Sequence, residues 1–365
     1  MIGSEYRKKM MERSLISTGN NSRMKEAIKK ANSGETVNMV FLGGSITDGY
    51  NGGENGCFAK LACDSFRNHF GEDADVNYIN SGYPAANSTL GLIRVEEDVI
   101  RYRPDIVFID FAVNDTKEGI SREVYESLIR RLLKSESKPA VVLLFMISEM
   151  GYTCQGHMQA IGEYYNLPMI SCGDALLHEI EANRMEWPDF LTDNIHPNEN
   201  GHKLLAEFIT HYFERVIKSV DDLEYGMPKV PFYGNSFENV KLLDASDARL
   251  DSAGSFDGKD ISYRFHNGWK HTPSSGDISF KMVLGFKNLF AVYKESKRAD
   301  TGSIEIHIDG KYTTTLQEFS SFGFDNPAAN LLFKENISGA HLVEIRMVSG
   351  DIKKEFSLMA FAYSC

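Results

Sequence analysis

Strand-like and helix-like segments alternate from about residue 36 to residue 217, and this alternation restricts the fold more than any other feature of the sequence. It predicts a mostly parallel sheet with helices on both faces. Short apolar runs predict buried strands at Val37–Leu42, Val76–Asn80, Asp105–Phe111, Ala140–Ile147 and Leu167–Ser171. Helical periodicity marks residues 21–33, Cys57–Phe70, Thr89–Tyr102, Arg122–Lys134, Cys154–Tyr165, Gly173–Arg184 and Gly201–Ile217.

The pattern changes after about Val220, where short alternating runs replace helical periodicity. Asp309-Gly310 between two such runs is a strong signal for a two-residue β-hairpin. With 365 residues, two domains are expected. We predict an α/β domain over residues 1–220, with a short N-terminal helical extension, and an all-β sandwich of jelly-roll type over residues 221–365. The predicted strands of the second domain lie in Ile278–Val283, Asn288–Tyr293, Gly302–Ile308, Lys311–Leu316, His341–Met347 and Glu355–Tyr363.

The first predicted strand runs directly into Gly43-Gly44-Ser45. Two glycines allow a sharp turn that a Cβ would resist, and this turn places Ser45 at the carboxyl edge of the sheet. Open α/β sheets bind their ligands at that edge. Ser45 is therefore a candidate nucleophile.

Near the end of the α/β pattern stands Asp193-Asn194-Ile195-His196-Pro197. An aspartate three residues before a histidine can accept the Nδ1 proton, which leaves Nε2 free to take a proton from a serine. Asn198 can cap the helix that follows this turn. The sequence thus predicts a catalytic triad of Ser45, Asp193 and His196.

Two further polar features follow predicted strands, Asn80-Ser81-Gly82 and Ala112-Val113-Asn114-Asp115. Each can deliver a hydrogen-bond donor to the edge that holds Ser45. The N–H groups of Ser45 and Gly82 and the side-chain amide of Asn114 would together form an oxyanion hole.

These four blocks, in this order, resemble the SGNH hydrolases, also called GDSL-type esterases and lipases. The resemblance covers roughly residues 35–217. The first block reads Gly-Gly-Ser-Ile-Thr where Gly-Asp-Ser-Leu is usual, and Ala112 stands where the third block usually has glycine. Neither change touches a reacting group. The resemblance implies a flavodoxin-like, three-layer α/β/α fold and a serine esterase that works through an acyl-enzyme.

The chain is also similar to bacterial carbohydrate esterases that carry a β-sandwich beside an SGNH domain. This similarity implies a small acyl ester, most simply acetyl, on a carbohydrate such as acetylated xylan or an oligosaccharide. Trp187, six residues before Asp193, and Trp269, in a loop-like stretch of the β domain, are candidate substrate contacts. Two alternatives remain open: a lysophospholipase-like or thioesterase-like hydrolase, and a carbohydrate-binding protein without activity.

Charge and composition limit the classes of partner and cofactor that we expect for this chain. The 39 basic and 51 acidic residues give a formal charge of −12, which argues against nucleic acid and anionic membranes as partners. No metal-ligand spacing is evident, so we expect neither a metal nor a cofactor. The five cysteines lack disulfide-like spacing and the N-terminus lacks an apolar signal segment. We therefore expect free thiols and a cytoplasmic protein, although a secreted mature form would look similar.

Overall fold

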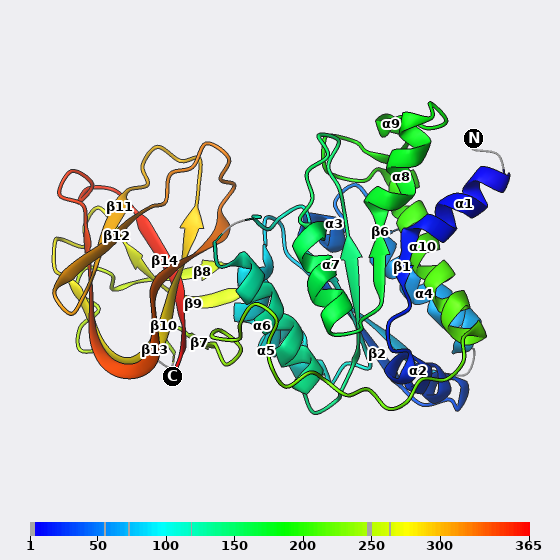
Figure 1. Cartoon of the computed structure of the whole chain (residues 1–365). Coiled ribbons are helices and arrows are strands. Elements are labelled where there is room, and N and C mark those ends of the chain that lie inside the picture. The colour runs from blue at the N-terminus through cyan, green and yellow to red at the C-terminus, as the bar shows by residue number, and fades with distance from the viewer. Residues whose placement is uncertain (1–3, 55, 72–73, 118, 247–249, 263) are drawn as a thin grey trace. The chain divides into compact units, whose positions relative to one another are not determined.

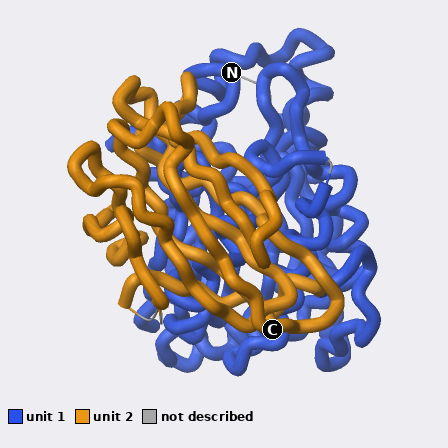
Figure 2. Tube along the Cα trace, turned by 90° about the vertical axis from the view of Figure 1, so that its left-hand side faces the viewer, with its two compact units in different colours: residues 1–235 blue, residues 236–365 orange. Residues whose placement is uncertain are grey.

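The computed structural model describes residues 4–54, 56–71, 74–117, 119–246, 250–262 and 264–365 (Figure 1). The chain divides into two compact units, Met1–Asn235 and Ser236–Cys365, which Figure 2 shows in different colours. The division follows Asn235 rather than residue 220, where the loss of helical periodicity placed it.

The sheet of the first unit contains six strands among the described residues. Five of them are parallel, in the order β6-β5-β4-β2-β3, and β1 pairs antiparallel with β6 at one edge. The order reverses between β2 and β4, as in flavodoxin-like sheets, and ligands bind such sheets at this switch point. The strands span Leu15–Ser17 (β1), Val37–Gly43 (β2), Val76–Gly82 (β3), Ile106–Asp110 (β4), Ala140–Phe145 (β5) and Met169–Ser171 (β6).

Helices cover both faces of this sheet, which gives the predicted three layers (Figure 1). Helices α5, α6 and α7 lie on one face, and α2, α4, α8 and α10 lie on the other. Strands β4 and β5 are buried along their whole length, which explains their continuous apolar runs. The helices span Ser4–Ser14 (α1), Ser22–Asn32 (α2), Ser45–Asp48 (α3), Phe58–Phe70 (α4), Ser88–Asp98 (α5), Ser121–Lys134 (α6), Gln155–Tyr164 (α7), Cys172–Glu181 (α8), Trp187–Phe190 (α9) and Glu199–Lys218 (α10), with a 3-10 turn at Ile100–Tyr102.

The second unit is all-β, as predicted. Its sheet is one antiparallel path in the order β12-β11-β13-β10-β14-β9-β8, with β7 also paired to β14. The sheet curls around its own apolar core, so it encloses that core as a jelly-roll-like sandwich does (Figure 1). The strands span Lys241–Leu243 (β7), Gly258–Ser262 (β8), Phe265–His271 (β9), Phe280–Glu295 (β10), Ser303–Ile308 (β11), Lys311–Gln317 (β12), Asn326–Met347 (β13) and Phe356–Ser364 (β14).

The hairpin prediction is confirmed, because Ile308 pairs with Lys311 across Asp309 and Gly310. Both turn residues have positive φ, 53° and 74°, as this kind of turn requires. The predicted strands Ile278–Val283 and Asn288–Tyr293 are two parts of the single strand β10, which continues through a register shift between Phe286 and Asn288.

Residues 219–235 form an extended segment that packs along the first unit. The Asn21 side chain bonds Ser219, Val220 and Asp222 in this segment. Further along, the buried carboxylate of Glu126 accepts the N–H groups of Phe232, Tyr233 and Gly234. This segment is therefore part of the first unit.

Candidate active site

The turn between β2 and α3 places Ser45 at the carboxyl edge of the sheet. Its two glycines are needed for space. A Cβ on Gly43 would lie 2.7 Å from the carbonyl oxygen of Asp110, and one on Gly44 would lie 2.7 Å from Oδ1 of Asn114. Gly44 has φ of −89°, so close approach rather than a left-handed backbone explains its presence. Ser45 is the first residue of α3, and its side chain is partly exposed.

The structure brings Ser45, His196 and Asp193 together in the predicted arrangement. Ser45 Oγ lies 2.8 Å from His196 Nε2, and His196 Nδ1 lies 2.8 Å from Asp193 Oδ2. Oδ1 of Asp193 accepts the N–H groups of Ile195 and His196, each at 2.8 Å. Burial alone would raise the pKa of Asp193, but these N–H groups and the His196 ring outweigh it and hold the pKa below its usual range.

Backbone contacts hold the turn that carries Asp193 and His196. Leu191 and Pro197 form an isolated β-bridge across it, and Glu149 N–H donates to the Asn194 carbonyl at 2.8 Å. Asn198 caps α10 by accepting the Gly201 N–H at 2.9 Å, as predicted. The base is therefore fixed to the start of a 20-residue helix.

Two of the three predicted oxyanion donors, Ser45 and Asn114, lie together at the turn between β2 and α3. Ser45 N–H is the first amide of α3, a position with no partner inside its helix. The Asn114 side chain lies beside Gly44, because a Cβ there would come within 2.9 Å of Nδ2.

Gly82 differs from the expectation. It ends β3, but its N–H donates to Oδ1 of Asn80 at 2.8 Å. The Asn80 amide also donates to the carbonyl of Thr47 at 2.8 Å. Gly82 can therefore act on an oxyanion only if Asn80 releases this N–H. A Cβ at Gly82 would lie 2.2 Å from the Asp48 nitrogen, so the close packing of β3 against α3 accounts for this glycine.

The two tryptophans have different surroundings. Trp187 begins α9, where it is partly exposed and packs against the core of the first unit. Trp269 lies within β9 and not in a loop, and its side chain is only 4% exposed. It packs against Phe280 and Phe361 in the core of the second unit. The prediction that Trp269 contacts substrate is therefore wrong, because no ring face is open.

Sequence reasoning did not single out Tyr50. The Tyr50 ring lies against the His196 ring, with centroids 4.7 Å apart, and its N–H donates to the Ser45 carbonyl at 3.1 Å. His202 is fully buried and contacts Tyr50 through the backbone. Tyr50 lies in a glycine-rich stretch without periodicity, so no local signal marked it.

Two buried carboxyl groups lie near this site. Asp110 is the last residue of β4, and Asp115 lies at the end of the turn that follows β4. Asp110 accepts a hydrogen bond from the Thr47 hydroxyl at 3.0 Å, and Asp115 accepts the Ser88 N–H at the start of α5 at 2.7 Å. Burial raises the pKa of each to about 7. They connect the turns that carry Ser45 and Asn114 to the rest of the sheet edge.

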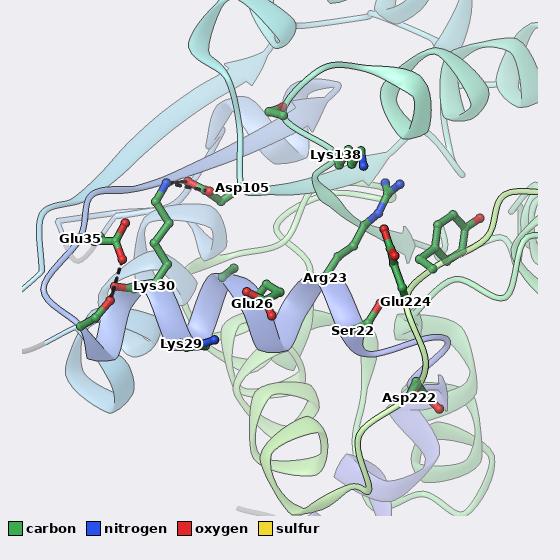
Figure 3. A pocket seen from close by; sticks show the side chains of 14 residues that line it. Ser22, Arg23, Glu26, Lys29, Lys30, Glu35, Asp105, Lys138, Asp222 and Glu224 are labelled. Carbon is green, nitrogen blue, oxygen red and sulfur yellow. Dashed lines mark hydrogen bonds and ion pairs between the residues drawn. The ribbon is translucent and has the colours of Figure 1, made fainter.

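A cavity lies at the amino edge of the sheet, opposite the edge that carries Ser45 (Figure 3). It has a volume of about 850 Å³, and many of its charged groups are already engaged. Lys30 pairs with Asp105 at 2.9 Å, and Arg23 donates to the carbonyls of Leu133 and Pro139 while it covers the Tyr225 ring. These contacts engage Arg23, Lys30 and Asp105 of its charged lining.

Within the described part of the chain, no group of three or more His, Cys, Asp or Glu residues could hold a metal ion. No described helix is long and apolar enough to span a bilayer. The five cysteines form no disulfide in the structure.

Comparison with known proteins agrees with this geometry. Residues 41–204 match the GDSL-like Lipase/Acylhydrolase family. The structure is similar to a two-domain esterase (CEX) active on acetylated mannans, co-crystallised with mannopentaose, with a TM-score of 0.87, 28% identity and 97% of each chain covered. Another structure of a two-domain esterase (CEX) active on acetylated mannans gives the same TM-score at 27% identity, over 97% of this chain and 98% of that one. No curated protein matches the chain.

Proposed function

Because residues 41–204 match the GDSL-like Lipase/Acylhydrolase family, we propose that the chain is a serine esterase that removes acetyl groups from oligosaccharides. The observation that carries the proposal is the pair of 2.8 Å contacts that join Ser45 to His196 and His196 to Asp193.

The chemistry follows from these contacts. His196 Nε2 takes the proton of Ser45 as the hydroxyl attacks the ester carbonyl, and Asp193 holds the tautomer that leaves Nε2 free. The Ser45 N–H and the Asn114 amide stabilise the oxyanion. As the bond between the acyl carbon and the sugar oxygen breaks, His196 gives its proton to that leaving oxygen, and a water activated by the same ring then hydrolyses the acetyl-enzyme.

Acetylated manno-oligosaccharides are our preferred substrates, in place of the acetylated xylan expected from the sequence. The support is the likeness to a two-domain esterase active on acetylated mannans, which extends over 97% of both chains and both units. Xylan, lysophospholipid and thioester substrates then serve as comparison substrates.

Ser45→Ala tests the chemistry. The variant should fold normally and lose about 10⁴- to 10⁶-fold of its turnover on 4-nitrophenyl acetate, because it lacks the nucleophile. An organophosphonate should label the wild-type protein at Ser45 and fail to label the variant. Wild-type turnover in the variant would remove Ser45 from the mechanism.

Acetylated manno- and xylo-oligosaccharides of equal length, compared by kcat/KM, test the substrate. A preference for the xylo series would overturn the assignment to mannan and leave the esterase intact. Specific binding of oligosaccharide without hydrolysis of any ester would favour the non-catalytic alternative.

A further inference from the structure

Tyr50 contacts two members of the proposed triad, Ser45 and His196. Its N–H donates to the Ser45 carbonyl at 3.1 Å, and its ring lies at 59° to the His196 ring with 4.7 Å between the centroids. Gly49 makes this possible. It has φ of 109°, which turns the chain back after α3, and a Cβ there would lie 2.9 Å from Cys57 Cβ.

His202 holds the backbone of Tyr50 from the other side. Its Nε2 lies 2.9 Å from the Tyr50 carbonyl oxygen, and its Nδ1 lies 3.2 Å from the Phe58 nitrogen. A carbonyl can only accept and an N–H can only donate, so His202 carries its proton on Nε2. The ring is fully buried, and this burial lowers its pKa, so it stays neutral.

These contacts connect two parts of the chain that meet only in the folded state. Ser45 and His196 are 151 residues apart, yet their side chains must stay within hydrogen-bond distance. His202 lies in α10, the helix whose N-cap Asn198 fixes the His196 turn. These contacts therefore form a continuous path from α10 through His202 and Tyr50 to Ser45. The path connects the nucleophile to the helix that holds its base.

We propose that Tyr50 is a positioning residue that fixes Ser45 relative to His196, and that His202 acts through Tyr50. The inference rests on the proposed esterase function, because turnover and covalent labelling are its readouts. In a His202 variant, a loss of this positioning should lower kcat and the rate of phosphonate labelling and leave KM nearly unchanged, because His202 is fully buried and out of reach of a substrate.

Two substitutions of His202 separate its two hydrogen bonds. The side-chain nitrogen of glutamine reaches about as far as Nε2, so H202Q keeps a donor for the Tyr50 carbonyl and gives up the acceptor for Phe58. H202N places its oxygen near Nδ1, so it keeps the Phe58 bond and gives up the Tyr50 bond. Each variant loses one buried hydrogen bond, so both should melt at similarly lowered temperatures.

The proposal expects different activities from these variants. H202N should lose about fivefold to tenfold in kcat and in labelling rate, whereas H202Q should stay within about twofold of the wild type. Equal losses in the two variants would show that His202 only supports the fold and would overturn the proposal.

Variants of Tyr50 provide a second test of the proposal, which applies even if a His202 variant fails to fold. Y50F keeps the ring and should stay within about twofold of the wild type, whereas Y50A should lose about tenfold in kcat. Y50A loses the ring contact with His196 but keeps both backbone hydrogen bonds of residue 50, so the double variant Y50A/H202N should be slower than Y50A. Wild-type rates in Y50A, or a double variant no slower than Y50A, would overturn the proposal. A wild-type protein that neither hydrolyses esters nor accepts the phosphonate would instead refute the esterase function itself.

Discussion

Asp110 and Asp115 are buried carboxyl groups beside the residues that we expect to perform the chemistry. One oxygen of each has no hydrogen-bond partner among the described residues. Burying a charge costs free energy unless it is paired, so each group holds its proton to a higher pH in the folded chain than in the unfolded chain. Their titration should therefore appear in the stability of the protein.

The direction of this change in stability follows from the protonation of Asp110 in the folded and unfolded chains. The pKa of Asp110 is raised to about 7 in the folded chain, whereas the unfolded chain releases this proton near pH 4. Between these values the folded state binds more protons, so the free energy of unfolding falls as pH rises from about 4 to 7. The free energy of unfolding of Asp110→Asn, relative to that of the wild type, should therefore increase as the pH rises from 5 to 8. Urea unfolding at both pH values measures this change, and a difference independent of pH would contradict it.

Asn114 is the clearest side-chain candidate for an oxyanion donor, because it lies beside Gly44 at the nucleophile turn. Asn114→Ala should lower kcat by about 10²-fold or more with little change in KM, because an oxyanion donor acts mainly on the transition state. Steady-state kinetics with 4-nitrophenyl acetate measure both constants. A change confined to KM would instead make Asn114 a substrate-binding residue.

At the scale of elements, the segment over residues 219–235 depends on α6. Glu126 of that helix is fully buried, and its carboxylate accepts the N–H groups of Tyr233 at 2.6 Å and Gly234 at 2.9 Å. It also accepts the hydroxyl of Tyr165. One buried carboxylate therefore anchors the end of the first unit.

Glu126→Gln should loosen this segment, because an amide offers one acceptor oxygen and turns a donor toward the remaining N–H groups. We expect a loss of roughly 1–3 kcal/mol in the free energy of unfolding and faster hydrogen exchange at residues 232–234. Glu136→Gln is a matched control, because Glu136 forms an exposed pair with Arg103 that contributes little. Equal effects of the two substitutions would show that the hydrogen bonds of Glu126 contribute no more to stability than the exposed pair does.

At the scale of the whole molecule, every residue in the proposed reaction lies in the first unit, whose boundary follows Asn235. A fragment of residues 1–235 should therefore fold and hydrolyse a small synthetic acetate. A fragment of residues 1–220 should melt at a lower temperature, because it loses the three N–H groups that donate to the Glu126 carboxylate. Thermal unfolding of the two fragments compares them directly. Equal stability would place the functional boundary at residue 220.

The sequence by itself determined the features that depend on neighbours along the chain. Alternating strand and helix patterns give the parallel sheet, because periodicity reflects which face each element buries. The Gly-Gly-Ser turn and the Asp193–His196 turn are also local, since the latter is closed by hydrogen bonds across two and three residues. These signals were enough to predict the triad geometry and the α/β fold.

Long-range packing decided the remainder. Nothing near Tyr50 in sequence shows that its ring meets His196. Trp269 was predicted to lie in a loop, but strand pairing with β14 places it in the core. Residues 221–235 are irregular in sequence yet belong to the first unit. Each of these outcomes depends on partners distant in sequence, and only the tertiary structure brings those partners together.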